Sequence, residues 1–324
     1  LDLLKKFKDE QTCIDYLYQL RWSEQVISPF DSSSKVYECK DNKFHCNNTK
    51  KYFTVKTGTL FESSRLPLQK WFLAIYIITS HKKGISSHQL AKDIDVTQKT
   101  AWFMLQRIRN CFGMDDKSEL EGIIESDETF VGGKNKNRHK DKKVQNSQGR
   151  SFKDKTPILG LIERQEKQII SRPHKVIKDS IVNEVVIIKP SFVICRVVAD
   201  TKMKTIQPVL KSIVKPLSRL ITDEWCAYDG LNSVYDHYIV DHSKKEYVNH
   251  EDNTIHSNSI EGVWSILKRG IIGVYHYTSR KHLQKYANEF TFRYNTRHHK
   301  ESERFNLFFN YFQNRLTYKM LING

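Results

Sequence analysis

Apolar side chains recur at helical spacing over much of the first third of the chain. Residues 1–22 and 67–84 each predict one helix. Residues 86–112 divide into a short helix, a turn and a second helix that begins after Thr97, a predicted N-cap. This arrangement is typical of a helix-turn-helix. Residues 27–61 instead alternate short aromatic runs with polar turns, which predicts small strands.

From about residue 119 the period of the pattern changes to that of strands. We expect four strands, at 120–133, 156–164, 191–200 and 217–225. We expect three helices, at 201–215 with Thr201 as its cap, at 259–269 and at 279–297. Strands followed by an alternation of strands and helices predict an α/β fold with a mixed sheet flanked by helices.

These patterns divide the chain into four predicted parts. They are an N-terminal helix with a small β segment (1–62), a helix-turn-helix region (63–115), an α/β domain (119–300) and a C-terminal helical tail (301–324). The 324 residues are enough to bury a sizeable core.

The excess of positive charge along the chain indicates a polyanionic partner. The 53 Lys and Arg residues exceed the 37 Asp and Glu residues, and the net charge is +16. Such an excess favours nucleic acid, with an anionic membrane surface as the weaker alternative. Six of the ten residues from Lys134 to Lys143 are basic, which predicts a solvated loop.

Membrane insertion and a disulfide framework are not indicated by the sequence. The chain contains no apolar run near the roughly 18 residues that a spanning helix needs. The N-terminal residues lack the long apolar segment of a signal peptide. The six cysteines are scattered and form no CxxC pair, so we expect reduced thiols and a cytoplasmic protein.

Three carboxylates stand in apolar surroundings. Asp127 lies inside the strand "IIESDETFV", Asp223 ends the strand "LITDEW", and Glu261 lies on the helix of "HSNSIEGVWSILKRG". A buried acid is costly unless it is paired or binds a cation, and three carboxylates would suit Mg²⁺. The alternative for each acid alone is a cap or turn residue. Strand alternation puts Glu125 on the face of Asp127, as a predicted solvated acid, and Glu128 on the opposite face.

Three stretches together carry a family resemblance: "ESDETFVGGK", "ITDEWCAYDGL" and "HSNSIEGVWSILKRGIIGVYHYTSRKHLQKYANEFTFRYN". They resemble the DDE transposases of a bacterial insertion-sequence family related to the eukaryotic Merlin elements, over about residues 20–298. The resemblance implies an RNase H-like catalytic domain. It implies cleavage of DNA at transposon ends, followed by transfer of the freed strands into target DNA.

The resemblance also assigns roles to particular residues. Asp127, Asp223 and Glu261 would be catalytic and would bind two Mg²⁺ or Mn²⁺ ions. Lys268, seven residues after Glu261, would hold a DNA phosphate, with Arg269 assisting; a solvated basic pair is the alternative.

Further residues are predicted to contact DNA. Gln98, Lys99 and Thr100 open the second helix of the helix-turn-helix and are expected to read bases. Phosphate contacts are expected from basic side chains on that helix and in the basic loop, namely Arg107, Arg109, Lys134, Lys136, Arg138, Lys140, Lys142 and Lys143. Double-stranded DNA is the expected partner, and a homodimer or higher oligomer is implied. The protein would lie with the nucleoid of a bacterium, or in the nucleus of a eukaryote.

Two departures from the family pattern leave other functions open. The family's four-cysteine zinc ribbon is reduced to "SPFD" (28–31) and "CNNT" (46–49), so only Cys46 is in register and we predict no zinc. We expect an apolar core of Tyr37, Phe44, Tyr52 and Phe53 in its place. Residues 169–195 form a longer segment than the family pattern has. The alternatives are a catalytically inactive DNA-binding relative and an RNase H-like nuclease.

Overall fold

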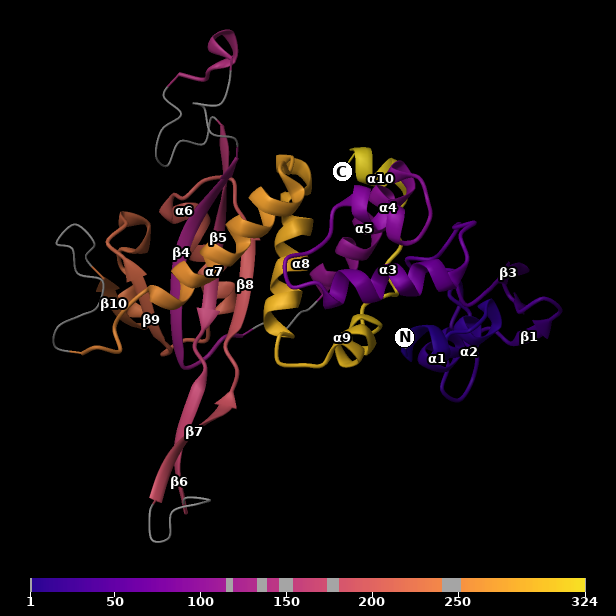
Figure 1. The fold of residues 1–324 in the computed structure, drawn as a ribbon, viewed down its shortest axis with the longest axis horizontal. Helices are drawn as coiled ribbons and strands as arrows, with labels where there is room; N and C mark the ends of the chain where they lie inside the picture. Colours follow the sequence, from indigo (N-terminus) through magenta and orange to yellow (C-terminus); the bar gives the residue numbers. More distant parts are fainter. Residues whose placement is uncertain are drawn as a thin grey trace. The chain divides into compact units, whose positions relative to one another are not determined.

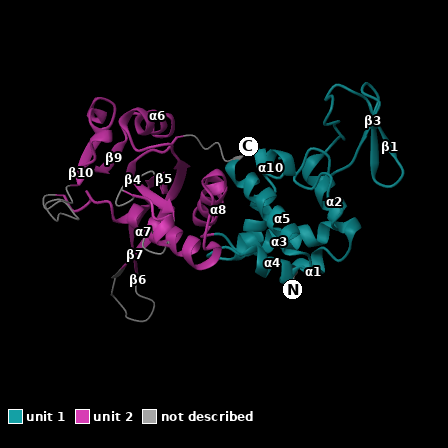
Figure 2. Cartoon of the chain, turned by 90° about the horizontal axis from the view of Figure 1, so that it is seen from above, with its two compact units in different colours: residues 1–115, 299–324 teal, residues 116–298 magenta. Residues whose placement is uncertain are grey.

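The structure is a computed structural model that describes residues 2–114, 119–132, 139–145, 154–173, 181–240 and 252–323. The chain divides into two compact units (Figure 2). Unit 1 contains residues 1–115 and 299–324, and unit 2 contains residues 116–298. Among the described residues, no helix combines the length and apolar character needed to cross a membrane.

Unit 1 is mainly helical. Its helices are α1 (Asp2–Lys6), α2 (Glu10–Arg21), α3 (Leu68–Ser80), α4 (Ser87–Asp93), α5 (Gln98–Cys111), α9 (Glu301–Phe308) and α10 (Tyr318–Asn323), with a 3₁₀ turn at Phe112–Met114. The prediction of one helix over 1–22 is wrong because Asp9 caps a new helix, where its carboxylate accepts the Thr12 amide at 2.8 Å.

Aromatic rings from both ends of the chain form the core of unit 1. Phe72 of α3 contacts the ring of Phe7 at 4.8 Å between centroids, of Phe309 at 5.2 Å and of Phe305 at 5.9 Å. The Leu60 amide donates to the Phe312 carbonyl at 3.0 Å. Residues 299–324 therefore complete a core that the N-terminal residues begin.

A small antiparallel sheet precedes α3. It consists of β1 (Val36–Cys39), β2 (Lys43–Cys46) and β3 (Lys51–Phe53). Phe44 and Phe53 are buried, as predicted, and their ring centroids lie 5.5 Å apart. Tyr37 and Tyr52 were predicted to join this core, but they are exposed because they point to the other face of the sheet. Cys46, the last residue of β2, is buried, and all six cysteines, which lie in the described ranges, are free.

The helix pair α4 and α5 begins at the residues that the sequence indicates. Ser86 accepts the Gln89 amide at 3.1 Å, and Thr97 accepts the Thr100 amide at 3.3 Å. The turn between the helices includes Asp95 in a left-handed conformation, with φ of 50°. The two helices and the Thr97 cap are confirmed, whereas their role in binding DNA stays a prediction.

Unit 2 contains a five-stranded mixed sheet (Figure 1). Its strands are β4 (Ile123–Gly132), β5 (Lys155–Glu163), β8 (Phe192–Val197), β9 (Arg219–Asp223) and β10 (Asp236–Val240), in the order β10-β9-β4-β5-β8. β9 is parallel to β4 and to β10, while β5 is antiparallel to β4 and to β8. The predicted mixed sheet is confirmed, and β10 is an edge strand that we did not predict.

Helices cover both faces of this sheet. On one face, α6 (Met203–Ile213) packs Ile206 and Leu210 against Leu159 and Leu161. On the other face, α7 (Asn258–Gly270) and α8 (Leu283–Asn295) pack against a cluster that includes Ile158. The alternation of side chains along β5 thus supplies two cores. The predicted Thr201 cap of α6 is wrong: Asp200 accepts the Lys202 amide and the Thr205 hydroxyl instead.

Shorter elements complete unit 2. They are the 3₁₀ turns Lys140–Lys142, Cys226–Tyr228, Leu231–Ser233 and Arg280–His282, and a π-helical turn at Ile271–Tyr275. Strands β6 (Glu166–Pro173) and β7 (Ile181–Lys189) pair with each other in a separate sheet. This hairpin extends beyond the five-stranded sheet (Figure 1) and accounts for much of the long segment at 169–195.

Candidate active site

Two aspartates come level on neighbouring parallel strands. The ladder between β4 and β9 pairs Ile123 with Arg219 and Glu125 with Ile221. The same offset, continued by two residues, brings Asp127 level with Asp223. Asp223 is buried at the end of β9, where its Oδ1 accepts the Trp225 amide at 3.1 Å. Asp127 is half-buried in the middle of β4.

Helix α7 brings Glu261 to the same face of β4. Trp264, one turn after Glu261, donates its indole N–H to Asp127 Oδ2 at 2.9 Å. The indole ring can lie this close to the sheet because residue 160, the partner of Asp127 on β5, is glycine. A Cβ on Gly160 would lie 2.2 Å from Trp264 Cη2. Glu261 itself is exposed.

The pKa of Asp127 shows that other carboxylates lie near it. The pKa of Asp127 is raised from 3.8 to about 6, and the largest causes of the rise are burial and then the charge of Asp223. Hydrogen bonds from the Glu128 amide and the Trp264 indole act in the opposite direction, and Glu261 adds to the rise. Asp223 and Glu261 are therefore both close enough to interact with Asp127 through their charges.

The donor set fits a hard divalent cation by its chemistry. Carboxylate oxygens are the ligands that Mg²⁺ prefers, and a cation would offset the repulsion among the three acids. Within the ranges that the structure describes, however, no three His, Cys, Asp or Glu side chains gather closely enough to hold a metal ion. Asp127, Asp223 and Glu261 are thus near one another but do not form a cluster that could hold a metal ion. Their role as metal ligands stays a prediction.

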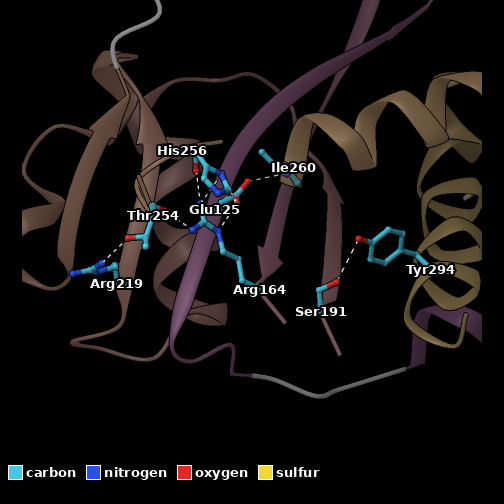
Figure 3. Close-up of polar contacts among 8 residues, drawn as sticks. All are labelled: Glu125, Arg164, Ser191, Arg219, Thr254, His256, Ile260 and Tyr294. Carbon is cyan, nitrogen blue, oxygen red and sulfur yellow. Dashed lines mark hydrogen bonds and ion pairs between the residues drawn. The ribbon is translucent and has the colours of Figure 1, made fainter. Parts of the chain in front are cut away.

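Glu125 is a buried charged group whose burial the sequence did not predict. The side chain is fully buried, not solvated as we expected, since it pairs with Arg164 and accepts the Ile260 amide at the start of α7 (Figure 3). His256, in the loop before α7, also contacts Arg164. Burial and the neighbouring guanidinium lower the pKa of His256. Strand alternation put Glu125 on the correct face, but no local pattern indicated a partner 39 residues away.

Glu128 lies on the opposite face, as predicted. It is buried and accepts the Tyr228 hydroxyl at 2.6 Å. Burial, together with this carboxylate, raises the pKa of Tyr228 well above its usual value. The Glu128 side chain therefore packs on the face covered by α6, and only its backbone amide contacts the candidate site.

Two basic residues follow Glu261 on α7. Lys268 is exposed near the end of the helix. Arg269 is also exposed, and its guanidinium donates to the carbonyl and the hydroxyl of Ser265 on its own helix. A phosphate contact from either side chain stays a prediction.

The predicted DNA-binding residues of unit 1 divide into exposed and buried groups. Gln98 and Lys99 are exposed at the start of α5, and Thr100 is half-buried beside its Thr97 cap. Arg107 is 5% exposed and Arg109 is 1% exposed. The prediction that these two arginines hold DNA phosphates is wrong, since their side chains belong to the core of unit 1.

Arg107 shows why an arginine is accommodated there. Its guanidinium donates to the Glu62 carbonyl at 2.6 Å and lies over the rings of Trp71 and Phe103. In the basic loop, Lys140, Lys142 and Lys143 are exposed. Lys134, Lys136 and Arg138 lie outside the described residues.

Comparison with known proteins gives two matches. The model of the ISXO2-like transposase domain matches residues 119–295. An uncharacterized protein in the transposable element ISH50 of Halobacterium salinarum is 28% identical over 287 residues, which cover 82% of this chain and 84% of that protein. No solved structure matches the chain.

Proposed function

The chain belongs to the ISXO2-like transposase family, and from this premise we propose that it cleaves DNA at the ends of a transposable element and joins the freed strands to target DNA. The observation that carries the proposal is the position of Asp127. It lies level with Asp223, and Trp264 joins it to the helix that bears Glu261. The strand order β10-β9-β4-β5-β8, with β4 antiparallel to β5 and parallel to β9, supports an RNase H-like domain.

We assign the binding of divalent ions to the three carboxylates. Asp127, Asp223 and Glu261 would hold two Mg²⁺ or Mn²⁺ ions, which when bound activate the attacking hydroxyl and neutralise charge on the phosphate. The chain's own part is to place these carboxylates. The Trp264 indole orients Asp127, and Lys268, about two turns beyond Glu261, would hold a flanking phosphate. Zinc is not part of the proposal, and the link to Merlin elements stays a prediction.

Double-stranded DNA is the proposed partner. The excess of 16 positive charges, the exposed lysines of the Lys140–Lys142 turn and the start of α5 support it. The family resemblance implies that two transposon ends are processed together, so we propose a homodimer or a higher oligomer. The protein would act at the nucleoid of a bacterium or in the nucleus of a eukaryote.

Cleavage assays on duplex DNA from either side of the reading frame test the activity. We expect Mn²⁺-dependent nicking by the wild type, loss of at least about a hundredfold in Asp127→Asn, and no change in Asp200→Asn, whose carboxylate only holds the start of α6. Products joined to a target plasmid would separate a transposase from a nuclease. Equal nicking by wild type and Asp127→Asn would defeat the assignment of the site.

Binding measurements test the proposed phosphate contact of Lys268. Lys268→Ala should weaken DNA binding and lower the slope of log K against log salt by about one. Lys211→Ala is the matched control, because Lys211 is also an exposed lysine and lies on α6, which covers the other face of the sheet. Equal slopes for the two variants would leave Lys268 as a solvated residue.

A catalytically inactive DNA-binding relative is the second candidate. The observation in its favour is that, in the described ranges, the acidic side chains do not gather into a cluster able to hold a metal ion. DNA binding without nicking by the wild type, under any divalent cation, would support this candidate.

A further inference from the structure

Glu125 connects the strand that carries Asp127 to the helix that carries Glu261. It lies on β4 two residues before Asp127, and its side chain is 0% exposed. Its Oε2 accepts the amide of Ile260 at 2.9 Å, and Ile260 directly precedes Glu261 on α7. One side chain therefore joins a position two residues before Asp127 to the residue directly before Glu261 (Figure 3).

We propose that Glu125 and Arg164 form a positioning pair that sets the place of Glu261 relative to Asp127. This role rests on the proposed function above. Glu125 is not itself assigned as a metal ligand, because both of its oxygens are engaged within the fold. Oε1 accepts Arg164 Nε at 2.5 Å and lies 3.5 Å from His256 Nδ1, while Oε2 binds the start of α7.

Arg164 suits this place because its planar guanidinium donates in three directions. Besides Glu125, it donates to the Thr254 carbonyl at 2.5 Å and to the His256 carbonyl at 2.6 Å. These two carbonyls belong to the loop that leads into α7. A lysine carries the same charge but has no rigid fork to reach three acceptors at once.

The strand of Asp223 contacts the same loop. Arg219, at the start of β9, donates to the Thr254 hydroxyl at 3.3 Å (Figure 3). The same guanidinium also donates to Asp252 at 3.4 Å. The entry to α7 is thus held by side chains from β4 and β9 and by Arg164, which directly follows β5. Asp127 and Asp223 lie on the first two of these strands, so the network links all three proposed ligands.

A buried ion pair can also serve stability alone, and the chain contains a pair for comparison. Glu289 of α8 is fully buried and pairs with Arg293 on the same helix and with the Tyr275 hydroxyl. Its removal should destabilise unit 2 as removal of Glu125 does. Glu289→Gln is therefore the matched control for Glu125→Gln.

The test uses the full chain labelled with 5-fluorotryptophan. Trp264 contacts Asp127, and its ¹⁹F resonance, assigned with Trp264→Phe, reports how α7 lies on the sheet. Mn²⁺ titration gives the affinity of the proposed site. We expect Glu125→Gln to shift or broaden the Trp264 resonance and to lower Mn²⁺ affinity on the order of tenfold, with neither effect in Glu289→Gln.

Arg164→Lys keeps the positive charge and provides a second variant if Glu125→Gln does not fold. It should move the same resonance and lower Mn²⁺ affinity in the same direction. An unmoved Trp264 resonance in the folded variants, or equal Mn²⁺ affinity in Glu125→Gln and Glu289→Gln, would overturn the proposal. A wild type that neither binds Mn²⁺ nor nicks DNA would defeat the proposed function. In that event the Trp264 resonance alone would decide whether the pair sets the geometry.

Discussion

Replacing Asp127 with Asn is expected to stabilise unit 2 when divalent cations are absent. The ionised carboxylate is half-buried beside Asp223 and Glu261, and these surroundings raise its pKa from 3.8 to about 6. At 1.36 kcal/mol for each pKa unit, ionisation costs at most about 3 kcal/mol, and partial exposure to solvent reduces this to about 1–3 kcal/mol. Asparagine has the same shape, can accept the Trp264 indole N–H, and carries no charge.

The sign of the pH dependence follows from the raised pKa. A group whose pKa is higher in the folded state binds its proton more tightly there, so the wild type loses stability as pH rises from about 4 to about 6 and little beyond. Asp127→Asn lacks this loss. The two proteins should therefore unfold alike near pH 4 and differ by about 1–3 kcal/mol near pH 7.5.

Urea unfolding in EDTA at both pH values, followed by tryptophan fluorescence, to which Trp225 and Trp264 contribute from unit 2, measures the difference. Mn²⁺ should then stabilise the wild type alone, since a ligand that binds only the folded state raises its stability. Asp200→Asn is the control of opposite sign, because the Thr205 hydroxyl and the Lys202 amide lower the pKa of Asp200. The reasoning is refuted if Asp127→Asn is the less stable protein near pH 7.5, or if its advantage is the same at both pH values.

Three further substitutions test the packing. Gly160→Ala should lower the thermal stability of unit 2 by about 1–3 kcal/mol, since its Cβ would overlap the Trp264 ring, and adding Trp264→Phe should recover part of the loss; an unchanged melting temperature would contradict this. Tyr228→Phe removes a hydrogen bond from the buried Glu128 and should cost about 1–3 kcal/mol in urea unfolding; a change within experimental error would show that this hydrogen bond contributes little. Arg107→Ala should destabilise unit 1 but leave the salt dependence of DNA binding unchanged in fluorescence anisotropy. A slope of log K against log salt that is lower by about one in the variant would instead support the predicted contact between Arg107 and a DNA phosphate.

Much of the fold was predictable because its elements have strong periodic patterns and clear caps. The strand that carries Asp127 and the helix capped by Thr97 appear where the sequence indicates. The edge strand β10 was missed because it is only five residues long and has a single fully buried position, at Val240. The break at Asp9 was missed because a capping side chain inside a helical pattern outweighs the periodicity.

The site was predictable in its acids but not in the contacts that position them. The family resemblance indicated Asp127, Asp223 and Glu261 together. It could not reveal that Trp264 donates to Asp127 or that Arg164 neutralises Glu125, because both contacts join residues distant in the sequence. Arg107 shows the converse error, since a positive charge on a helix predicts a phosphate contact only where the side chain is exposed.

The division of unit 1 into two stretches has a consequence for biosynthesis. The ribosome makes residues 1–115 first, yet Phe305 and Phe309, which pack on Phe72, emerge only after all of unit 2. Unit 2 can therefore complete its core while the nascent N-terminal helices still lack part of theirs. Chains stalled after residue 298 should accordingly show a protease-resistant unit 2 and a digestible N-terminal part. A resistant N-terminal part would mean that its core forms without those late phenylalanines.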